Sequence, residues 1–515
     1  MAKSVELGSK AASMASYVLF GKLFTLILVG VAFILVSRKL GPEQYGIYTL
    51  ATAFAGIFGT VGYFGTGTAL QKFIAQYNKS KSHEEANHLV SNALVIVLVT
   101  GSILVAAFLA LSSLISQYVY HTAAMSFIID AISIWIITAM LFGTMYDALI
   151  GFGGGRDVAI LAFGQSFFQA VIAIGLAYLG FGALAPIYGL VFGYMLGFFV
   201  GLYLVFKNNN INLKMPSRSY MKMLFSFSVP VAISNIFGSI ASNIGLIYLG
   251  YFVSTAVIGN IGIAARTNSF VSLVFDSVGL AILPVYSAAL SDKRASKDIG
   301  KMYGYTIYFA ILLVAPALFY MAAFSTPFSQ LLFGSNYSSA PLYISIASVG
   351  LLVGIIGTYA NTLFLSSGQV KLSLGYNAAI YTVLLLLLVL VIPTFGGLGY
   401  AIVSFVAIPF LVDVLFVVKL RKLYKLDLKL NKIARLVLAS LIPTVVFVLL
   451  GNYVGGVPLL AISFVGILVS YPLLAVLLGG ADQGDINTIK QLSSGIPLVG
   501  MAIDMLANYA SMVIG

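Results

Sequence analysis

Long apolar segments separated by short polar loops recur along almost the whole chain. A helix needs about 20 apolar residues to cross the roughly 30 Å hydrocarbon core of a bilayer, and we count about fourteen such segments. Their approximate centres are Thr25, Ala55, Ser102, Thr138, Ala170, Leu196, Ser239, Val271, Val314, Leu351, Leu386, Ile408, Val446 and Ile467. Because the segments are long and lack the period-two alternation of barrel strands, the pattern predicts an all-α polytopic membrane protein with about fourteen transmembrane helices.

The first two apolar segments are expected to form a hairpin. One covers residues 17–36, and the other lies within LGPEQYGIYTLATAFAGIFGTVGYFGTGTAL at residues 40–70. Gly41 and Pro42, between the two segments, are typical of a turn and do not continue a regular helix. We therefore expect two membrane-spanning helices joined at Gly41-Pro42.

The basic residues indicate which loops face the cytoplasm. If the N-terminus is inside, Lys and Arg concentrate in cytoplasmic loops, with the richest at residues 419–435, whereas the outward loops at residues 112–122 and 325–340 contain none. This distribution follows the positive-inside rule and predicts that both termini lie in the cytoplasm. We expect the protein to lie in the plasma or inner membrane of the cell. The outward loop at residues 325–340 contains the sequon Asn336-Tyr337-Ser338. This asparagine is an acceptor for N-glycosylation if the cell has the glycosylation machinery.

The composition excludes soluble classes of protein. The chain is 60% hydrophobic and 8% charged, whereas soluble domains carry roughly 25% charged residues. The net charge of +12 fits cationic loops facing anionic membrane lipids, so no nucleic acid partner is expected. The chain has no cysteine, which rules out disulfides and thiolate metal sites, and no metal or cofactor is expected.

Two long basic loops divide the chain into parts. The predicted organisation is two six-helix lobes related by a pseudo-twofold axis, plus a C-terminal helix pair. The boundaries are an N-lobe at 1–206, a cytoplasmic linker at 207–222, a C-lobe at 223–420, an amphipathic cytoplasmic loop at 421–434, the helix pair at 435–479, and a cytoplasmic or interfacial tail at 480–515. A weak internal repeat supports this division, because Gly46 and Gly65 in the first lobe match Gly259 and Gly279 in the second.

Two stretches of the chain resemble a known family. LGPEQYGIYTLA, followed by a glycine-rich helix and a basic loop, resembles the first hairpin of polysaccharide-transporter flippases. These belong to the multidrug, oligosaccharidyl-lipid and polysaccharide exporter superfamily. Residues 225–265 are similar to that family's seventh and eighth helices, although Asn243 stands where the family often has an acidic residue.

The resemblance implies a transporter rather than an enzyme. Its function would be alternating-access flipping of a polyprenyl-(di)phosphate-linked oligosaccharide from the cytoplasmic to the outer leaflet, for cell-surface polysaccharide or glycoprotein synthesis. Its partners would be that lipid-linked oligosaccharide and membrane lipids, and we expect a monomer. The alternatives are a cation-coupled multidrug exporter of the same superfamily and, from another class, a membrane glycosyltransferase or polymerase.

Charged residues inside apolar segments are the candidates for substrate binding, because each costs about 2.5 to 3.5 kcal/mol to insert. Arg266 and Lys22 are expected to bind the phosphate, and cations in the first and eighth helices line the cavity in the relatives. The alternative roles of the two residues are structural. Lys22 would then reach the membrane interface by snorkelling, and Arg266 would form an intramembrane ion pair without a ligand. Asp276 is either a structural counter-ion or the site of H⁺ or Na⁺ coupling. Asp130, Asp147 and Asp413 lie nearer predicted helix ends, where an interfacial position is expected.

Polar side chains within the spans are the candidates for sugar contacts. They are Asn235, Asn243, Gln165 and Gln169, with Asn361 and Asn377 as further amides. Amides in membrane helices also serve as hydrogen-bonding links between helices, so both roles stay open. Arg38 and Lys39, beside the first turn, are either interfacial anchors or interfacial contacts for an anion.

Overall fold

The structure is a computed structural model that describes residues 2–79, 82–118, 124–209, 211–291, 298–451 and 453–487. Side chains of residues 2–24 and of some positions in the seventh, eighth and twelfth helices lie outside this description. Every regular element within the described ranges is a helix, which confirms the predicted fold class. The chain divides into two compact units, Met1–Gly259 and Asn260–Gly515.

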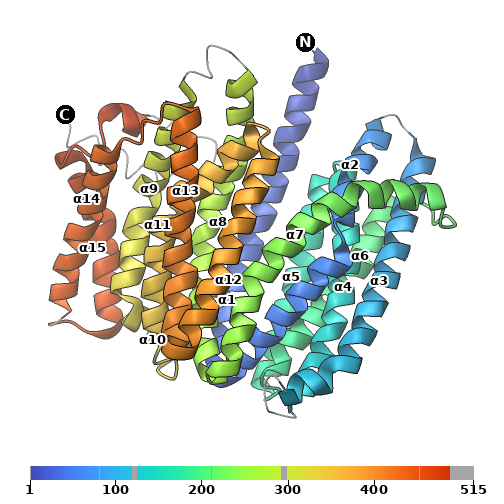
Figure 1. Ribbon diagram of the computed structural model, residues 1–515, viewed down its shortest axis with the longest axis horizontal. Helices are drawn as coiled ribbons and strands as arrows, with labels where there is room; N and C mark the ends of the chain where they lie inside the picture. Colours follow the sequence, from blue (N-terminus) through green and yellow to red (C-terminus); the bar gives the residue numbers. More distant parts are fainter. Residues whose placement is uncertain are drawn as a thin grey trace. The chain divides into compact units, whose positions relative to one another are not determined.

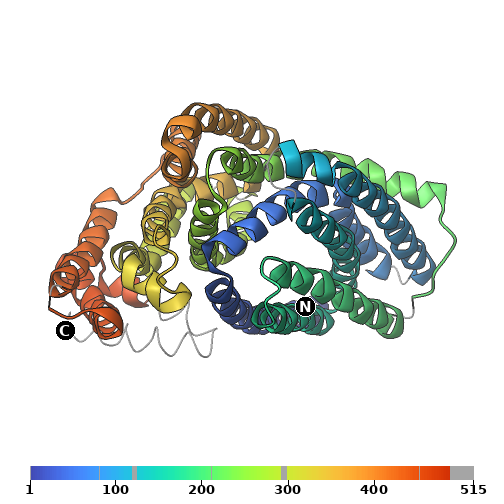
Figure 2. The same cartoon turned by 90° about the horizontal axis from the view of Figure 1, so that it is seen from below.

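The first unit is a bundle of seven helices. They are α1 (Ala2–Tyr63), α2 (Thr66–Lys79), α3 (His83–Tyr118), α4 (Ala124–Phe152), α5 (Gly155–Tyr178), α6 (Leu184–Asn209) and α7 (Arg218–Phe252). α5 packs on α1 and α6, while α4 packs on α2, α3 and α6. Figure 1 shows these helices lengthwise and Figure 2 shows them nearly end-on.

A stripe of glycines brings α5 and α6 into close contact. Gly189, Gly193, Gly197 and Gly201 recur at every fourth residue on one face of α6. A Cβ atom on Gly193 would lie 2.7 Å from the Cβ of Gln169 on α5. Small residues at this spacing let two helix backbones approach, which is how membrane helices associate where no hydrophobic effect drives them together.

The predicted hairpin is present as one helix with a sharp reversal. In Figure 1, α1 runs down from the label N and then turns back upward. The reversal is at Gly41, whose backbone has φ 73° and ψ 173° and is the non-helical point inside α1. Glycine adopts this positive φ at little cost, and the Pro42 that follows lacks the N–H of a continuing helix. The rings of Phe33 and Tyr45, one on each arm, lie 6.1 Å apart.

Gly46 and Gly259, the residues that begin the predicted repeat, face each other where α1 crosses the start of α8 (Thr255–Ser291). A Cβ on Gly46 would overlap the carbonyl oxygen of Thr255, and a Cβ on Gly259 would overlap that of Pro42. Each glycine thus faces the carbonyl four residues before the other. This reciprocity is what two equivalent segments produce when they cross about a twofold axis.

The second unit contains the rest of α8 and the helices that follow. They are α9 (Ile299–Ala323), α10 (Ser325–Phe333), α11 (Ala340–Ser366), α12 (Val370–Ala401), the π-helical segment η2 (Ile402–Ala407), α13 (Ile408–Leu423), α14 (Leu430–Leu450) and α15 (Gly456–Leu477). α11 packs on α9 and α13, and α14 packs on α9 and α15.

Ten helices of the described chain are long and apolar enough to cross a membrane. Two of these stretches, of 39 and 52 residues, contain a glycine with positive φ, at Gly41 and Gly396. If each of these two stretches is counted as two spans and α7 and α8 are added, the number is consistent with the predicted fourteen. The division into six-helix lobes stays a prediction.

The first residues of the predicted tail attach to the second unit. The ammonium of Lys432 lies 2.7 Å from Asp482 and 2.8 Å from Asp485, and the hydroxyl of Tyr308 donates to the carbonyl of Gly480 at 2.8 Å. The hydrogen bond from Lys432 stabilises the ionised carboxylate and holds the pKa of Asp482 below its ordinary value. Residues 488–515 of that tail lie outside the described residues.

Candidate functional site

The first unit encloses a cavity of about 660 Å³, here called the first-unit cavity. Its walls come from α1, α4 and α7 and are mostly small residues. It is lined by Ala55, Gly56, Gly59, Thr60, Tyr63, Gly65, Trp135, Ile136, Ala139, Met140, Gly143 and Gly238. This volume is within the range of about 300 to 1,000 Å³ typical of small-molecule sites.

A partly buried polar network lies at one wall of this cavity. The phenol of Tyr63 donates a hydrogen bond to one carboxylate oxygen of Asp147, and the side-chain amide of Gln71 donates to the other at 2.6 Å. A Cβ atom on Gly67 would overlap the carboxylate, so the sequence leaves room for Asp147 there. Asp147 therefore links the end of α1 to α2 across the break at Phe64, which has φ 49°.

The structure shows the contacts of Asp147 and Asp413, which the sequence placed near helix ends. Asp147 accepts hydrogen bonds from two neighbouring helices, as described above. Asp413 is 8% exposed and accepts the backbone N–H of Gly357 on α11 at 2.5 Å. Donors on neighbouring helices therefore hold both carboxylates, and their expected interfacial position stays a prediction.

Replacing Asp147 with alanine is expected to destabilise the first unit. The change leaves the Tyr63 and Gln71 donors without their acceptor, and each unsatisfied buried group costs about 1 to 3 kcal/mol. Thermal unfolding in detergent micelles measures the effect, with Glu43→Ala, which removes an exposed acidic residue of α1, as the control. An unfolding midpoint for Asp147→Ala equal to that of the wild type would show that the network does not support the fold.

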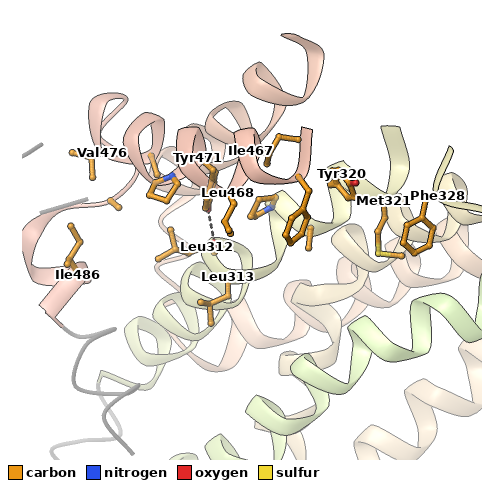
Figure 3. Close-up of a pocket in the computed structure, with 16 residues that line it drawn as sticks. Leu312, Leu313, Tyr320, Met321, Phe328, Ile467, Leu468, Tyr471, Val476 and Ile486 are labelled. Carbon is orange, nitrogen blue, oxygen red and sulfur yellow. Dashed lines mark hydrogen bonds between the residues drawn. The ribbon is translucent and has the colours of Figure 1, made fainter. Parts of the chain in front are cut away.

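The second unit contains an apolar groove of about 440 Å³ between α9 and α15, here called the second-unit groove. Figure 3 shows its side chains, with Phe328 of α10 at one end and Ile486 at the other. Pro316 lacks the N–H that the carbonyl of Leu312 would accept in a regular helix. The hydroxyl of Tyr471 on α15 donates to that carbonyl at 2.7 Å instead, the dashed line in Figure 3. The hydrogen bond satisfies the orphaned carbonyl and joins the two walls of the groove.

Arg266 lies on α8 within the second unit, and its side chain is exposed. Its guanidinium is 5.8 Å from the centre of the Phe270 ring on the same helix. The next residues, Thr267 and Asn268, are buried, and Ser348 of α11 donates to the amide oxygen of Asn268 at 3.4 Å. The side of α8 at Asn268 therefore packs on α11, while Arg266 points away from that contact. Among the described residues Arg266 forms no ion pair.

Three predicted site residues lie where the structure describes the backbone but not the side chain. They are Lys22 in α1, Asn235 in α7 and Asp276 in α8. Their predicted roles stay predictions.

The predicted amides make contacts within the protein. Gln165 donates to Gln169 at 2.7 Å, and Gln169 faces the glycine stripe of α6. Asn243 donates to the carbonyl of Ser239 at 2.9 Å, and its side chain lies 3.6 Å from the position of a Cβ on Gly56 of α1. Each of these hydrogen bonds lies within one helix, α5 or α7, so the helix-linking role and the sugar-binding role both stay predictions.

Arg38 and Lys39 are exposed beside the hairpin turn, as expected from their position in the sequence. The ammonium of Lys39 lies 5.4 Å from the centre of the Tyr178 ring at the end of α5. A cation over an aromatic ring at this distance gains a modest attraction. This contact fits an anchoring role at the hairpin turn, and contact with an anion stays a prediction.

Trp135 and Tyr63 were not among the site residues predicted from the sequence. Trp135 is the single tryptophan of the chain, and its indole nitrogen is buried with no hydrogen-bond partner among the described residues. The rarity of tryptophan was a signal that could have selected it. Nothing in the local sequence could have paired Tyr63 with Asp147, because they lie 84 positions apart.

The helical fold, apolar spans and intramembrane cavities together define a polytopic membrane transporter. Residues 12–290 match the model of the polysaccharide biosynthesis protein family, more than half of the chain. The chain belongs to this family, which confirms the resemblance seen in its sequence. A "Probable low-salt glycan biosynthesis flippase Agl15" of Haloferax volcanii is 24% identical over 391 residues, which cover 74% of this chain and 76% of that protein.

Solved structures show the same fold at lower sequence identity. A lipid II flippase MurJ in an inward closed conformation aligns with a TM-score of 0.72 at 15% identity, covering 89% of this chain and 98% of that one. An inward-facing multidrug resistance MATE family transporter aligns with a TM-score of 0.65 at 17% identity, covering 77% of this chain and 94% of that one. Both similarities concern the fold.

Proposed function

We propose that this protein is a flippase that moves a polyprenyl-(di)phosphate-linked oligosaccharide from the cytoplasmic to the outer leaflet by alternating access. The observation that carries the proposal is Arg266, an exposed guanidinium on α8 with no ion pair among the described residues. A cation in a membrane protein is costly and is usually retained for function. A planar guanidinium binds a phosphate through two parallel hydrogen bonds. The flippase names of relatives such as Agl15 support the same reading.

The second-unit groove supplies a place for the other half of such a substrate. It is lined almost wholly by carbon, with Leu312, Leu313, Ile467 and Leu468 on facing helices. Such an apolar lining is compatible with a polyprenyl hydrocarbon chain, which has no polar groups to hydrate. We assign the polyprenyl chain to this groove and the phosphate to Arg266. Lys22 stays a candidate for the phosphate on the basis of the sequence alone.

Ion coupling, location and oligomeric state are further parts of the proposal. H⁺ or Na⁺ coupling is proposed, with Asp276 as the candidate from the sequence. The charge pattern of the loops supports a cytoplasmic position for both termini. Location in the plasma or inner membrane and a monomeric state are also proposed.

A flipping assay in proteoliposomes tests the proposal. Purified protein is reconstituted with a fluorescent polyprenyl-diphosphate oligosaccharide, and the fraction exposed on the outer surface is followed with a membrane-impermeant quencher. We expect transfer between leaflets well above that of protein-free liposomes. If the protein moves no lipid-linked oligosaccharide but exports organic cations, the multidrug-exporter alternative replaces the flippase.

A further inference from the structure

The first-unit cavity carries features of a carbohydrate site. Trp135 lines it, and its indole ring is held in an edge-to-face contact with Tyr194 at 6.1 Å. An indole held in this way offers a fixed aromatic face. The electron-rich face of an aromatic ring attracts groups that carry partial positive charge, such as the C–H groups on one face of a pyranose ring.

The residues around Trp135 offer acceptors for hydroxyl groups. Tyr63 uses its proton in the bond to Asp147, so its phenol oxygen keeps lone pairs that can accept. Thr60 donates to the carbonyl of Gly56 at 2.9 Å, and its oxygen likewise keeps accepting capacity. The residues that line the cavity are uncharged, which suits a neutral sugar better than an organic cation.

The remaining walls are built so that a ring can approach closely. Gly59 and Gly238 both line the cavity, and a Cβ on either would have no heavy atom within 4 Å. These two positions therefore face open space rather than a neighbouring helix. Glycine there leaves volume that any side chain would fill.

We propose that the first-unit cavity binds a pyranose unit of the substrate's glycan, stacked on Trp135. This assignment rests on the proposed flippase function and names a sugar subsite within the first unit. It assigns Trp135 to substrate recognition and Asp147 to positioning the Tyr63 hydroxyl.

Intrinsic fluorescence tests the proposal directly, because Trp135 is the single tryptophan in the chain. The full-length protein in nanodiscs is titrated with a polyprenyl-diphosphate oligosaccharide and, separately, with bare polyprenyl diphosphate. We expect a saturable change in tryptophan emission with the glycan-bearing lipid and none with the bare lipid. Binding of both lipids is measured independently with radiolabelled material.

Gly59→Leu tests the sugar subsite by filling the cavity. A Cβ on Gly59 has no heavy atom within 4 Å, so the leucine side chain begins in open space. We expect the Kd for the glycan-bearing lipid to rise about tenfold, to the value for the bare lipid, and the emission change to be lost. Gly175→Leu is the control, because a Cβ at that α5 position also meets nothing within 4 Å but lies outside the cavity. Trp135→Ala is expected to weaken binding of the glycan-bearing lipid while leaving that of the bare lipid unchanged.

The outcomes separate the two proposals. If the glycan-bearing lipid binds and is flipped without changing tryptophan emission, or if Gly59→Leu binds it as the wild type does, the sugar subsite is wrong and the flippase stands. If neither lipid binds or is flipped, the flippase and the subsite both fail. If organic cations change the emission and the glycan does not, the cavity is a drug site.

Discussion

Arg266→Ala is expected to abolish most phosphate-dependent substrate binding. A hydrogen bond to a charged group contributes about 1.5 to 3 kcal/mol, so losing the guanidinium raises the Kd for polyprenyl diphosphate by roughly tenfold to a hundredfold. Flipping in proteoliposomes falls with it. The fold should be retained, because Arg266 is exposed and makes no ion pair among the described residues. Radiolabelled lipid binding at low and high salt measures the loss.

Two control variants make this test specific. Arg266→Lys keeps the charge but not the two parallel hydrogen bonds, and we expect an intermediate Kd. Arg156→Ala removes an exposed arginine in the first turn of α5 and should leave binding unchanged. If Arg266→Ala binds the diphosphate as tightly as the wild type, the phosphate is held elsewhere and the assignment of Arg266 is refuted.

Gly46→Leu is expected to lower the stability of the protein. A Cβ at this position would overlap the carbonyl oxygen of Thr255, which is backbone and cannot rotate away. Overpacking inside a protein costs about 1 to 3 kcal/mol and occasionally more, and here relief requires the two helices to separate. The opposing gain in helix propensity over glycine is only about 0.5 to 1 kcal/mol. Steric overlap therefore dominates, and we expect a lower unfolding temperature and a lower yield of monodisperse protein.

Gly164→Leu on α5 is the matched control for this prediction. A Cβ on Gly164 meets no heavy atom within 4 Å, so this variant gains helix propensity without an overlap. Its unfolding temperature should equal or slightly exceed that of the wild type. Equal unfolding temperatures for Gly46→Leu and Gly164→Leu would show that the crossing of α1 and α8 can open without cost.

Gly46 and Gly259 show what the internal repeat in the sequence predicts and what it does not. The sequence indicated that the two glycines are equivalent, since each is followed by a second glycine about twenty residues later. It did not indicate that they touch. Contact depends on how two helices cross, and a crossing is decided by the shapes of both surfaces together.

The sequence by itself determined the class of protein, the reversal at Gly41-Pro42 and the family. Each of these depends on local properties: apolar segments long enough for a bilayer, a glycine-proline pair that ends a helix, and motifs contiguous in the chain. Arg266 as a candidate site residue also came from a local feature, a charge within an apolar segment, and its role stays a prediction.

Only the tertiary structure decided which polar residues are engaged with the protein and where the cavities lie. Asp147 and Asp413 accept hydrogen bonds from Tyr63, Gln71 and Gly357 on neighbouring helices, contacts that no local pattern in the sequence indicates. The two cavities are formed by helices that are far apart in the chain, α1 with α4 and α7, and α9 with α15. Hydrophobic periodicity identifies a buried face but not its neighbour, because many helices present similar apolar surfaces. Which helices meet is decided by the small residues and hydrogen bonds that fit one pairing better than the others.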